Sequence, residues 1–132
     1  MEKAGRLEKE AFDDLKRGNA NKCASALYFS LHRLSCELLT LLNERIPRRD
    51  DKLANAIENK GLLTAAMALR HLYALRKKAD YSPESVTLPE IEETLELYRS
   101  AKEELLKKIK EVVDRRKIKS SQGTWRSDES VL

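Results

Sequence analysis

An unbroken apolar seam from about Ala20 to Arg45 constrains the fold more than any other feature of the sequence. Its members recur every three or four residues, the spacing that places side chains on one face of an α-helix. They are Ala24, Leu27, Leu31, Leu34, Leu38 and Leu41. Asn19 is a favourable N-cap, and Pro47 ends the helical stretch. Because the polar side chains fill only a narrow stripe, we expect a central helix with apolar residues in the core or at a subunit interface. Those residues are Tyr28, Leu31, Leu38 and Leu42.

Three further long segments show the same helical periodicity. They cover about Glu2–Arg17, Leu62–Asp80 and residues 87–117. The last opens with TLPE, in which Thr87 and Glu90 can form a capping box. Each segment therefore has its own start or stop signal.

These segments predict an all-α protein. A short helix is expected at about Lys52–Asn59, capped by an aspartate and ended by Gly61. Four long helices and one short helix joined by short loops favour an antiparallel up-down bundle. We assign residues 1–118 to this bundle and residues 119–132 to a polar, mobile tail. Trp125 in the tail is either exposed or an anchor for another chain.

Composition and charge exclude several classes of protein. No stretch reaches the roughly 18 to 20 apolar residues of a membrane span, and the charged N-terminus is unlike a secretory signal, so we expect a cytoplasmic location and no membrane partner. The net charge is +4, but residues 115–132 hold five basic and two acidic groups, which leaves +1 for residues 1–114. Such a body does not predict specific binding to duplex DNA. Cys23 and Cys36 lie about 20 Å apart on one helix, too far for a disulfide, so both are expected as free thiols.

The sequence carries no metal or cofactor signature. It has no Glu-x-x-His pair, and its two histidines, His32 and His71, fall on different helices. Its four glycines are isolated, which excludes a phosphate-binding P-loop. We therefore expect no metal site and no cofactor.

Arg76 occupies a position where the helical periodicity predicts an apolar side chain. Tyr73 and Asp80 share its helical face. A purely structural interpretation is an Arg76–Asp80 pair with Tyr73 packed across the guanidinium stem. A functional interpretation has the same guanidinium binding a phosphate or a carbonyl of a partner, with Lys77 adding positive potential nearby.

Two segments resemble HEPN domains. SALYFSLHRLSCELL on the second helix is similar to the aromatic and leucine pattern of that family, and LRKKADYSPES is similar to its Arg-x-Lys-Ala-Asp-Tyr segment. The matching residues are Arg76, Lys78, Ala79, Asp80 and Tyr81. The resemblance covers about residues 5–115. It implies a four- or five-helix bundle that acts as a homodimer, is paired with a minimal nucleotidyltransferase in a toxin-antitoxin-like system, and binds nucleotides or RNA.

The sequence departs from the HEPN ribonucleases at one decisive position. Those relatives carry a histidine four to six residues after the arginine, whereas here Tyr81 stands five residues after Arg76. A phenol with a pKa near about 10 is a poor general base at neutral pH. We therefore expect a non-catalytic module with a ligand site made of Arg76, Asp80, Tyr81, Tyr73 and Lys77. One alternative is a weak metal-independent ribonuclease that uses Arg76 with His71 or Tyr81, and another is a purely structural assembly subunit.

Overall fold

Five helices and no strand make up the described part of the chain. The computed structural model describes the backbone of residues 2–81 and 86–125, and the side chains of residues 2–80 and 86–118. The helices are α1 (Glu2–Lys16), α2 (Ala20–Leu41), α3 (Asp50–Glu58), α4 (Leu63–Tyr81) and α5 (Leu88–Trp125). The all-α prediction is thus confirmed, while the antiparallel up-down connectivity stays a prediction.

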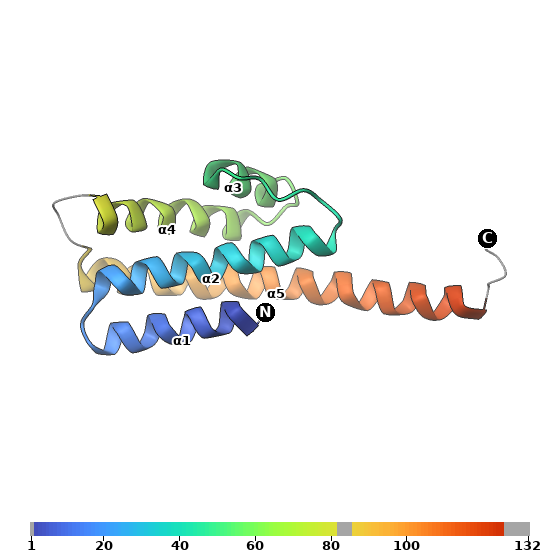
Figure 1. Ribbon diagram of the computed structural model, residues 1–132, viewed down its shortest axis with the longest axis horizontal. Helices are drawn as coiled ribbons and strands as arrows, with labels where there is room; N and C mark the ends of the chain where they lie inside the picture. Colours follow the sequence, from blue (N-terminus) through green and yellow to red (C-terminus); the bar gives the residue numbers. More distant parts are fainter. Residues whose placement is uncertain (1, 82–85, 126–132) are drawn as a thin grey trace.

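Helix α2 lies at the centre of this arrangement. It contacts α1, α4 and α5, and Figure 1 shows it between α1 and α4. The predicted seam is buried: Leu27, Leu31 and Leu38 are each 0% exposed. Tyr28 is 1% exposed, and Leu42 packs half-buried against the same core. The residues that we placed in a core or at a subunit interface therefore belong to the core of this single chain.

The helix ends show how local chemistry sets the boundaries. The Asn19 side chain accepts from the backbone N–H of Lys22 at 3.3 Å, as expected of an N-cap. The capping box is also present: the Thr87 N–H donates to Glu90 Oε1 at 3.0 Å, and the Glu90 N–H donates to Thr87 Oγ1 at 3.3 Å. Both signals were readable from the sequence because they involve neighbours three residues apart.

The aspartate cap predicted for the short helix is wrong. The N-cap of α3 is Arg49, whose side chain makes no capping hydrogen bond. Asp50 and Asp51 instead occupy the first turn, where a negative charge interacts favourably with the helix dipole. This shift frees the Asp50 carboxylate for a contact with α2 that is described below.

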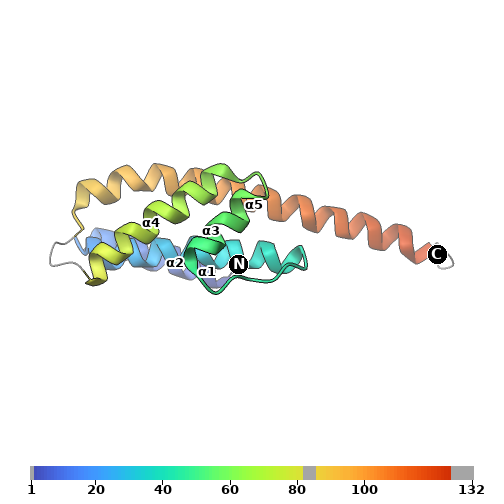
Figure 2. The same cartoon turned by 90° about the horizontal axis from the view of Figure 1, so that it is seen from above.

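Helix α5 continues well past the end that the sequence predicted. We expected it to stop near Lys117, but it reaches Trp125, and both views show it extending beyond the other helices (Figures 1 and 2). No proline interrupts this stretch, and its first glycine is Gly123, so nothing local breaks the helix earlier. The side chain of Trp125 and all of residues 126–132 lie outside the described residues.

A polar network fixes α1 against α2 and α5. The Tyr98 hydroxyl donates to Glu8 Oε1 at 2.8 Å and lies 2.9 Å from Ser30 Oγ, and the Ser30 hydroxyl donates to the Ala4 carbonyl at 2.9 Å. Lys102 Nζ pairs with the Glu8 carboxylate at 2.7 Å. Because buried polar groups need such partners, these bonds specify where α1 lies.

Candidate functional site

Arg76 lies at the seam between α4 and α2, against two aromatic rings. Its guanidinium carbon is 4.8 Å from the centroid of the Phe29 ring and 5.7 Å from that of Tyr28. The Arg76 side chain is 23% exposed, whereas Phe29 is 40% exposed. The guanidinium is therefore held by cation–π contacts at a partly desolvated surface, where such contacts are strongest.

The hydrogen-bonding capacity of this guanidinium is largely unused. Arg76 Nε lies 3.5 Å from Asp80 Oδ2, an ion-pair distance that is long for a hydrogen bond. The Nε atom is buried and has no hydrogen-bond partner among the described residues. Because the Nε atom is buried, the donors that the site offers to an anion are the four N–H groups on the two terminal nitrogens of the guanidinium.

The purely structural interpretation of Arg76 is only partly realised. The expected contact with Asp80 exists, but the rings over the guanidinium are those of Phe29 and Tyr28 rather than Tyr73. Tyr73 lies beside Tyr28, with ring centroids 5.8 Å apart. The ammonium nitrogen of Lys77 lies 5.3 Å from the centroid of the Tyr73 ring. Four of the five predicted site residues thus come together on α4.

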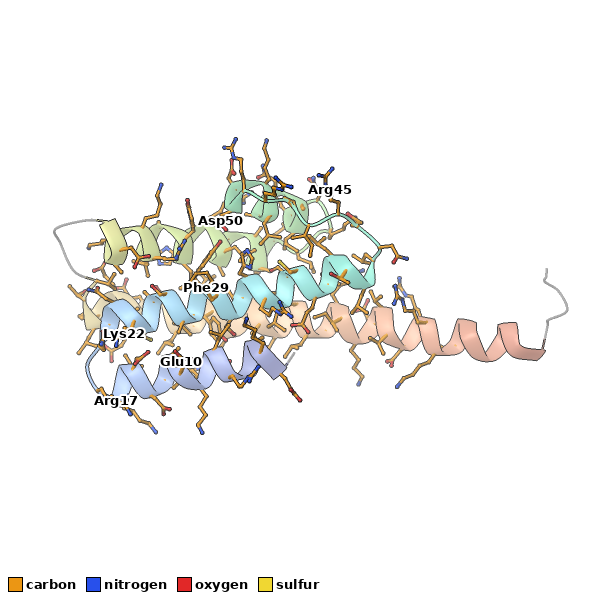
Figure 3. The ribbon with its side chains drawn as sticks, viewed as in Figure 1. Glu10, Arg17, Lys22, Phe29, Arg45 and Asp50 are labelled. Atoms are coloured by element: carbon orange, nitrogen blue, oxygen red, sulfur yellow. The ribbon has the colours of Figure 1, made fainter. Side chains whose placement is uncertain are left out.

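A second group of polar side chains adjoins Arg76. The Tyr28 hydroxyl donates a short hydrogen bond to Asp50 Oδ1, and His32 Nε2 lies 3.7 Å from the same oxygen. Asp50 lies at the start of α3 (Figure 3), and its hydrogen bond with Tyr28 connects α3 to α2. On its other side, His32 Nδ1 is 3.7 Å from Cys36 Sγ. Residues from α2, α3 and α4 therefore meet at one place.

Burial and nearby charges set the protonation states of Tyr28 and His32. Burial, followed by the hydrogen bond to Asp50 and its charge, raises the pKa of Tyr28 above its usual range. Burial lowers the pKa of His32, the Asp50 carboxylate opposes that shift, and the Arg76 charge reinforces it. At neutral pH the phenol is therefore protonated and the imidazole neutral.

His71 lies away from the Arg76 site. His71 Nε2 lies 2.9 Å from Thr94 Oγ1, so its ring faces α5 rather than the aromatic cluster on α2. The side chain of Tyr81 lies outside the described residues. Of the two residues that the ribonuclease alternative paired with Arg76, His71 is therefore not brought to it.

Sequence reasoning missed three members of the site: Phe29, His32 and Asp50. The first two could have been found, since Phe29 follows Tyr28 and His32 lies four residues after Tyr28 on the same helix, where side chains are neighbours. Asp50 could not, because it is 22 residues from Tyr28 and reaches it only through the tertiary fold.

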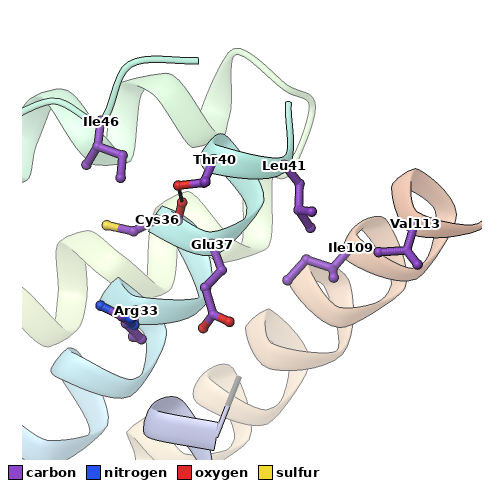
Figure 4. A pocket seen from close by; sticks show the side chains of 8 residues that line it. All are labelled: Arg33, Cys36, Glu37, Thr40, Leu41, Ile46, Ile109 and Val113. Atoms are coloured by element: carbon purple, nitrogen blue, oxygen red, sulfur yellow. Dashed lines mark hydrogen bonds between the residues drawn. The ribbon is translucent and has the colours of Figure 1, made fainter. Parts of the chain in front are cut away.

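Two cavities flank the central helix. One, of about 450 Å³, lies between α2 and α5 and is mostly apolar (Figure 4). Arg33, Glu37 and Thr40 form its polar side. The other, of about 270 Å³, is bounded by α1, α2 and α4 and has Phe29 and Asp80 in its wall. Only this second cavity shares residues with the Arg76 site.

The described residues contain no group of three or more metal-ligating side chains, and none of their helices is long and apolar enough to cross a membrane. Comparison of the chain with protein-family models, with curated proteins and with solved structures found no match. The likeness to HEPN domains therefore stays a prediction from the two sequence segments.

Proposed function

We propose that this chain is a non-catalytic, HEPN-like binding module in which Arg76 binds a phosphate group of a nucleotide or RNA. The module acts as a homodimer in the cytoplasm, on an up-down antiparallel bundle, and is partnered by a minimal nucleotidyltransferase in a toxin-antitoxin-like system. These assembly statements rest on the sequence resemblance. The phosphate site rests on the side-chain geometry.

The observation that carries the proposal is a guanidinium with unused donors on an aromatic ring. Arg76 makes no hydrogen bond to any described residue, yet Phe29 and Asp80 hold it from two sides. An arginine whose orientation is fixed loses less conformational entropy when it binds a phosphate with two parallel N–H···O bonds. Asp80 and Phe29 are positioning residues in this proposal, and Lys77 adds positive charge one residue along α4.

A metal-independent ribonuclease is the second candidate, and His32 is the observation that favours it. Its neutral imidazole lies beside Asp50 and close enough to Arg76 for that charge to lower its pKa. A neutral imidazole can accept a proton from a ribose hydroxyl, which Tyr81 cannot do well at neutral pH. In this alternative, His32 rather than His71 would act together with Arg76.

The phosphate site is tested by equilibrium binding of a labelled single-stranded RNA and of nucleoside monophosphates. Arg76→Met keeps the length of the side chain and removes the charge, and we expect affinity to fall by about tenfold to a hundredfold, the range for a hydrogen bond to a charged group. Arg76→Lys, which lacks the planar fork, should be intermediate. Arg99→Met is the matched control, because Arg99 also lies over an aromatic ring, that of Phe12, at 5.8 Å.

The outcomes separate the candidates. Equal loss in Arg76→Met and Arg99→Met would reveal general charge attraction and reject the site. Cleavage of the RNA in EDTA that disappears in both Arg76→Met and His32→Ala would replace the binding module with the ribonuclease. Dimerisation is checked by the mass of the native protein in solution, and the nucleotidyltransferase by copurification.

A further inference from the structure

The cavity of about 270 Å³ beside Phe29 adjoins the Arg76 site without including Arg76. Phe29 and Asp80 belong to both: each contacts the guanidinium, and each lines the cavity. Figure 3 shows Glu10 on α1 and Lys22 and Phe29 on α2, the two helices that form most of the wall. A ligand held by Arg76 could therefore extend past the Phe29 ring into this space.

The size and the aromatic wall of the cavity suit one flat ring system. Pockets for drug-sized ligands span roughly 300 to 1,000 Å³, so a cavity of about 270 Å³ fits a smaller group. Phe29 exposes 40% of its surface, so its ring is accessible to a ligand. Nucleobases stack on exposed aromatic rings of this kind in single-stranded RNA recognition.

The polar lining offers both acceptors and donors. Glu10 and Asp14 also line the cavity, and neither carboxylate has a hydrogen bond or ion pair with a described side chain, so both can accept hydrogen bonds from a ligand. Asn21 Oδ1 already accepts from the Val86 N–H at 2.9 Å, which leaves the Asn21 amide NH₂ to donate. Lys22 adds an ammonium at the rim.

This combination distinguishes among the bases. The Watson–Crick edge of guanine presents two adjacent donors that one carboxylate accepts together, and its ring also carries acceptors for an amide NH₂. Adenine and cytosine offer one amino group, and uracil offers one N–H. A neutral base also avoids the repulsion that a phosphate would meet beside Glu10 and Asp14.

We propose that this cavity, which we call the Phe29 pocket and define by Phe29, Glu10, Asp14, Asn21 and Lys22, binds a guanine base stacked on Phe29. The inference rests on the proposed phosphate site, since the phosphate of the same nucleotide would be held by Arg76. It adds a base preference that the phosphate site alone does not have.

The test is calorimetric titration of the full chain with GMP, AMP, CMP, UMP, guanosine and inorganic phosphate. We expect GMP to bind at least about tenfold more tightly than UMP, because stacking and a two-donor contact act together. Phe29→Ala should weaken GMP binding by about tenfold or more and weaken phosphate binding much less, because Phe29 positions Arg76 but does not contact the phosphate, whereas Phe29→Tyr, which keeps the ring, should retain GMP. The Glu10→Gln, Asp14→Asn double variant should bring the GMP to UMP ratio close to one. Phe12→Ala is the control, because the Phe12 ring lies under a different arginine, Arg99.

The results distinguish failure of the guanine pocket from failure of the phosphate site. If the four monophosphates bind equally but Arg76→Met abolishes their binding, the phosphate site stands and the guanine pocket is rejected. Guanosine binding that survives Arg76→Met, with no phosphate binding in wild type, would keep the pocket and reject the phosphate site. If spermidine binds in a manner dependent on Glu10 and Asp14 while guanosine does not, the cavity is a cation site and the inference fails. Absence of binding by every probe overturns both proposals.

Discussion

Replacing Tyr28 with phenylalanine tests whether the hydroxyl that joins α2 to α3 stabilises the site. Tyr28 is 1% exposed, and its hydroxyl donates to Asp50 Oδ1, while the Asp50 side chain is 28% exposed. A hydrogen bond to a charged partner contributes about 1.5–3 kcal/mol, so we expect the free energy of unfolding to fall by about 2 kcal/mol. In a domain of this size that corresponds to a Tm lower by about 6–10 °C.

The measurement is urea unfolding at pH 7 with Tyr73→Phe as the control. Tyr73 is half-buried in the same cluster, and its hydroxyl makes no hydrogen bond to any described residue, so its variant should lie within about 0.5 kcal/mol of wild type. If Tyr28→Phe also stays within that range, or if both variants lose equally, the hydrogen bond to Asp50 does not stabilise the fold.

The same variant has a predictable dependence on pH. Because the folded-state pKa of Tyr28 is raised above the usual value of about 10, the unfolded chain ionises first as the pH increases. The stability that this group contributes is therefore complete below about pH 10 and is lost above it, at up to about 1.4 kcal/mol per pH unit. Tyr28→Phe lacks this loss, so the gap between the wild-type and variant stabilities should start to narrow near about pH 10 and narrow further as the pH rises above that value. A gap that stays constant refutes the reasoning.

The remaining predictions concern the thiols and two glycines. Burial raises the pKa of Cys23 to about 11 and also raises that of Cys36, and because the thiolate is the nucleophile, both should react slowly with iodoacetamide at pH 8. Mass spectrometry should find half-buried Cys36 labelled first and Cys23 only after unfolding; rapid labelling of Cys23 in the folded protein would contradict its burial. Gly61 has a φ of 82°, so Gly61→Ala should cost about 1 kcal/mol, whereas Gly5→Ala within α1, where nothing lies within 4 Å of an added Cβ, should gain about 0.5–1 kcal/mol. Urea unfolding that gives both changes the same sign would contradict this assignment of backbone strain.

The sequence predicted those parts of the fold that depend on neighbours along the chain. The seam of α2, the Asn19 cap and the Thr87–Glu90 box follow from spacings of three or four residues, and all three are present. The end of α5 was harder, because a basic and polar segment without proline is compatible with either helix or coil, and no local signal stops it before Gly123. The start of α3 was also missed, because Asp50 lies in the first turn rather than at the N-cap and its carboxylate makes a tertiary contact, the bond with Tyr28.

The candidate site shows the same limit more sharply. Position 76 was identified because a charge interrupts an apolar repeat, and its pairing with Asp80 follows from their separation of four residues. The rings that hold the guanidinium come from α2, some 47 residues earlier in the chain in the case of Phe29. Periodicity cannot reveal which helices pack together, so it could point to Arg76 but not to Phe29, His32 or Asp50.

The energetics of Arg76 argue for a ligand rather than for a structural role alone. A guanidinium removed from water is costly unless its donors are satisfied, and here the buried Nε has no hydrogen bond within the described part of the chain. An apolar side chain of similar length would fill the same space between Phe29 and Asp80 without that cost, so Arg76→Met should leave the stability unchanged or raise it. If arginine at position 76 gives a less stable fold than methionine would, the guanidinium must have a function that an apolar side chain cannot perform. In the proposed binding module, that function is the binding of a phosphate by the terminal N–H donors of Arg76 beside the exposed Phe29 ring.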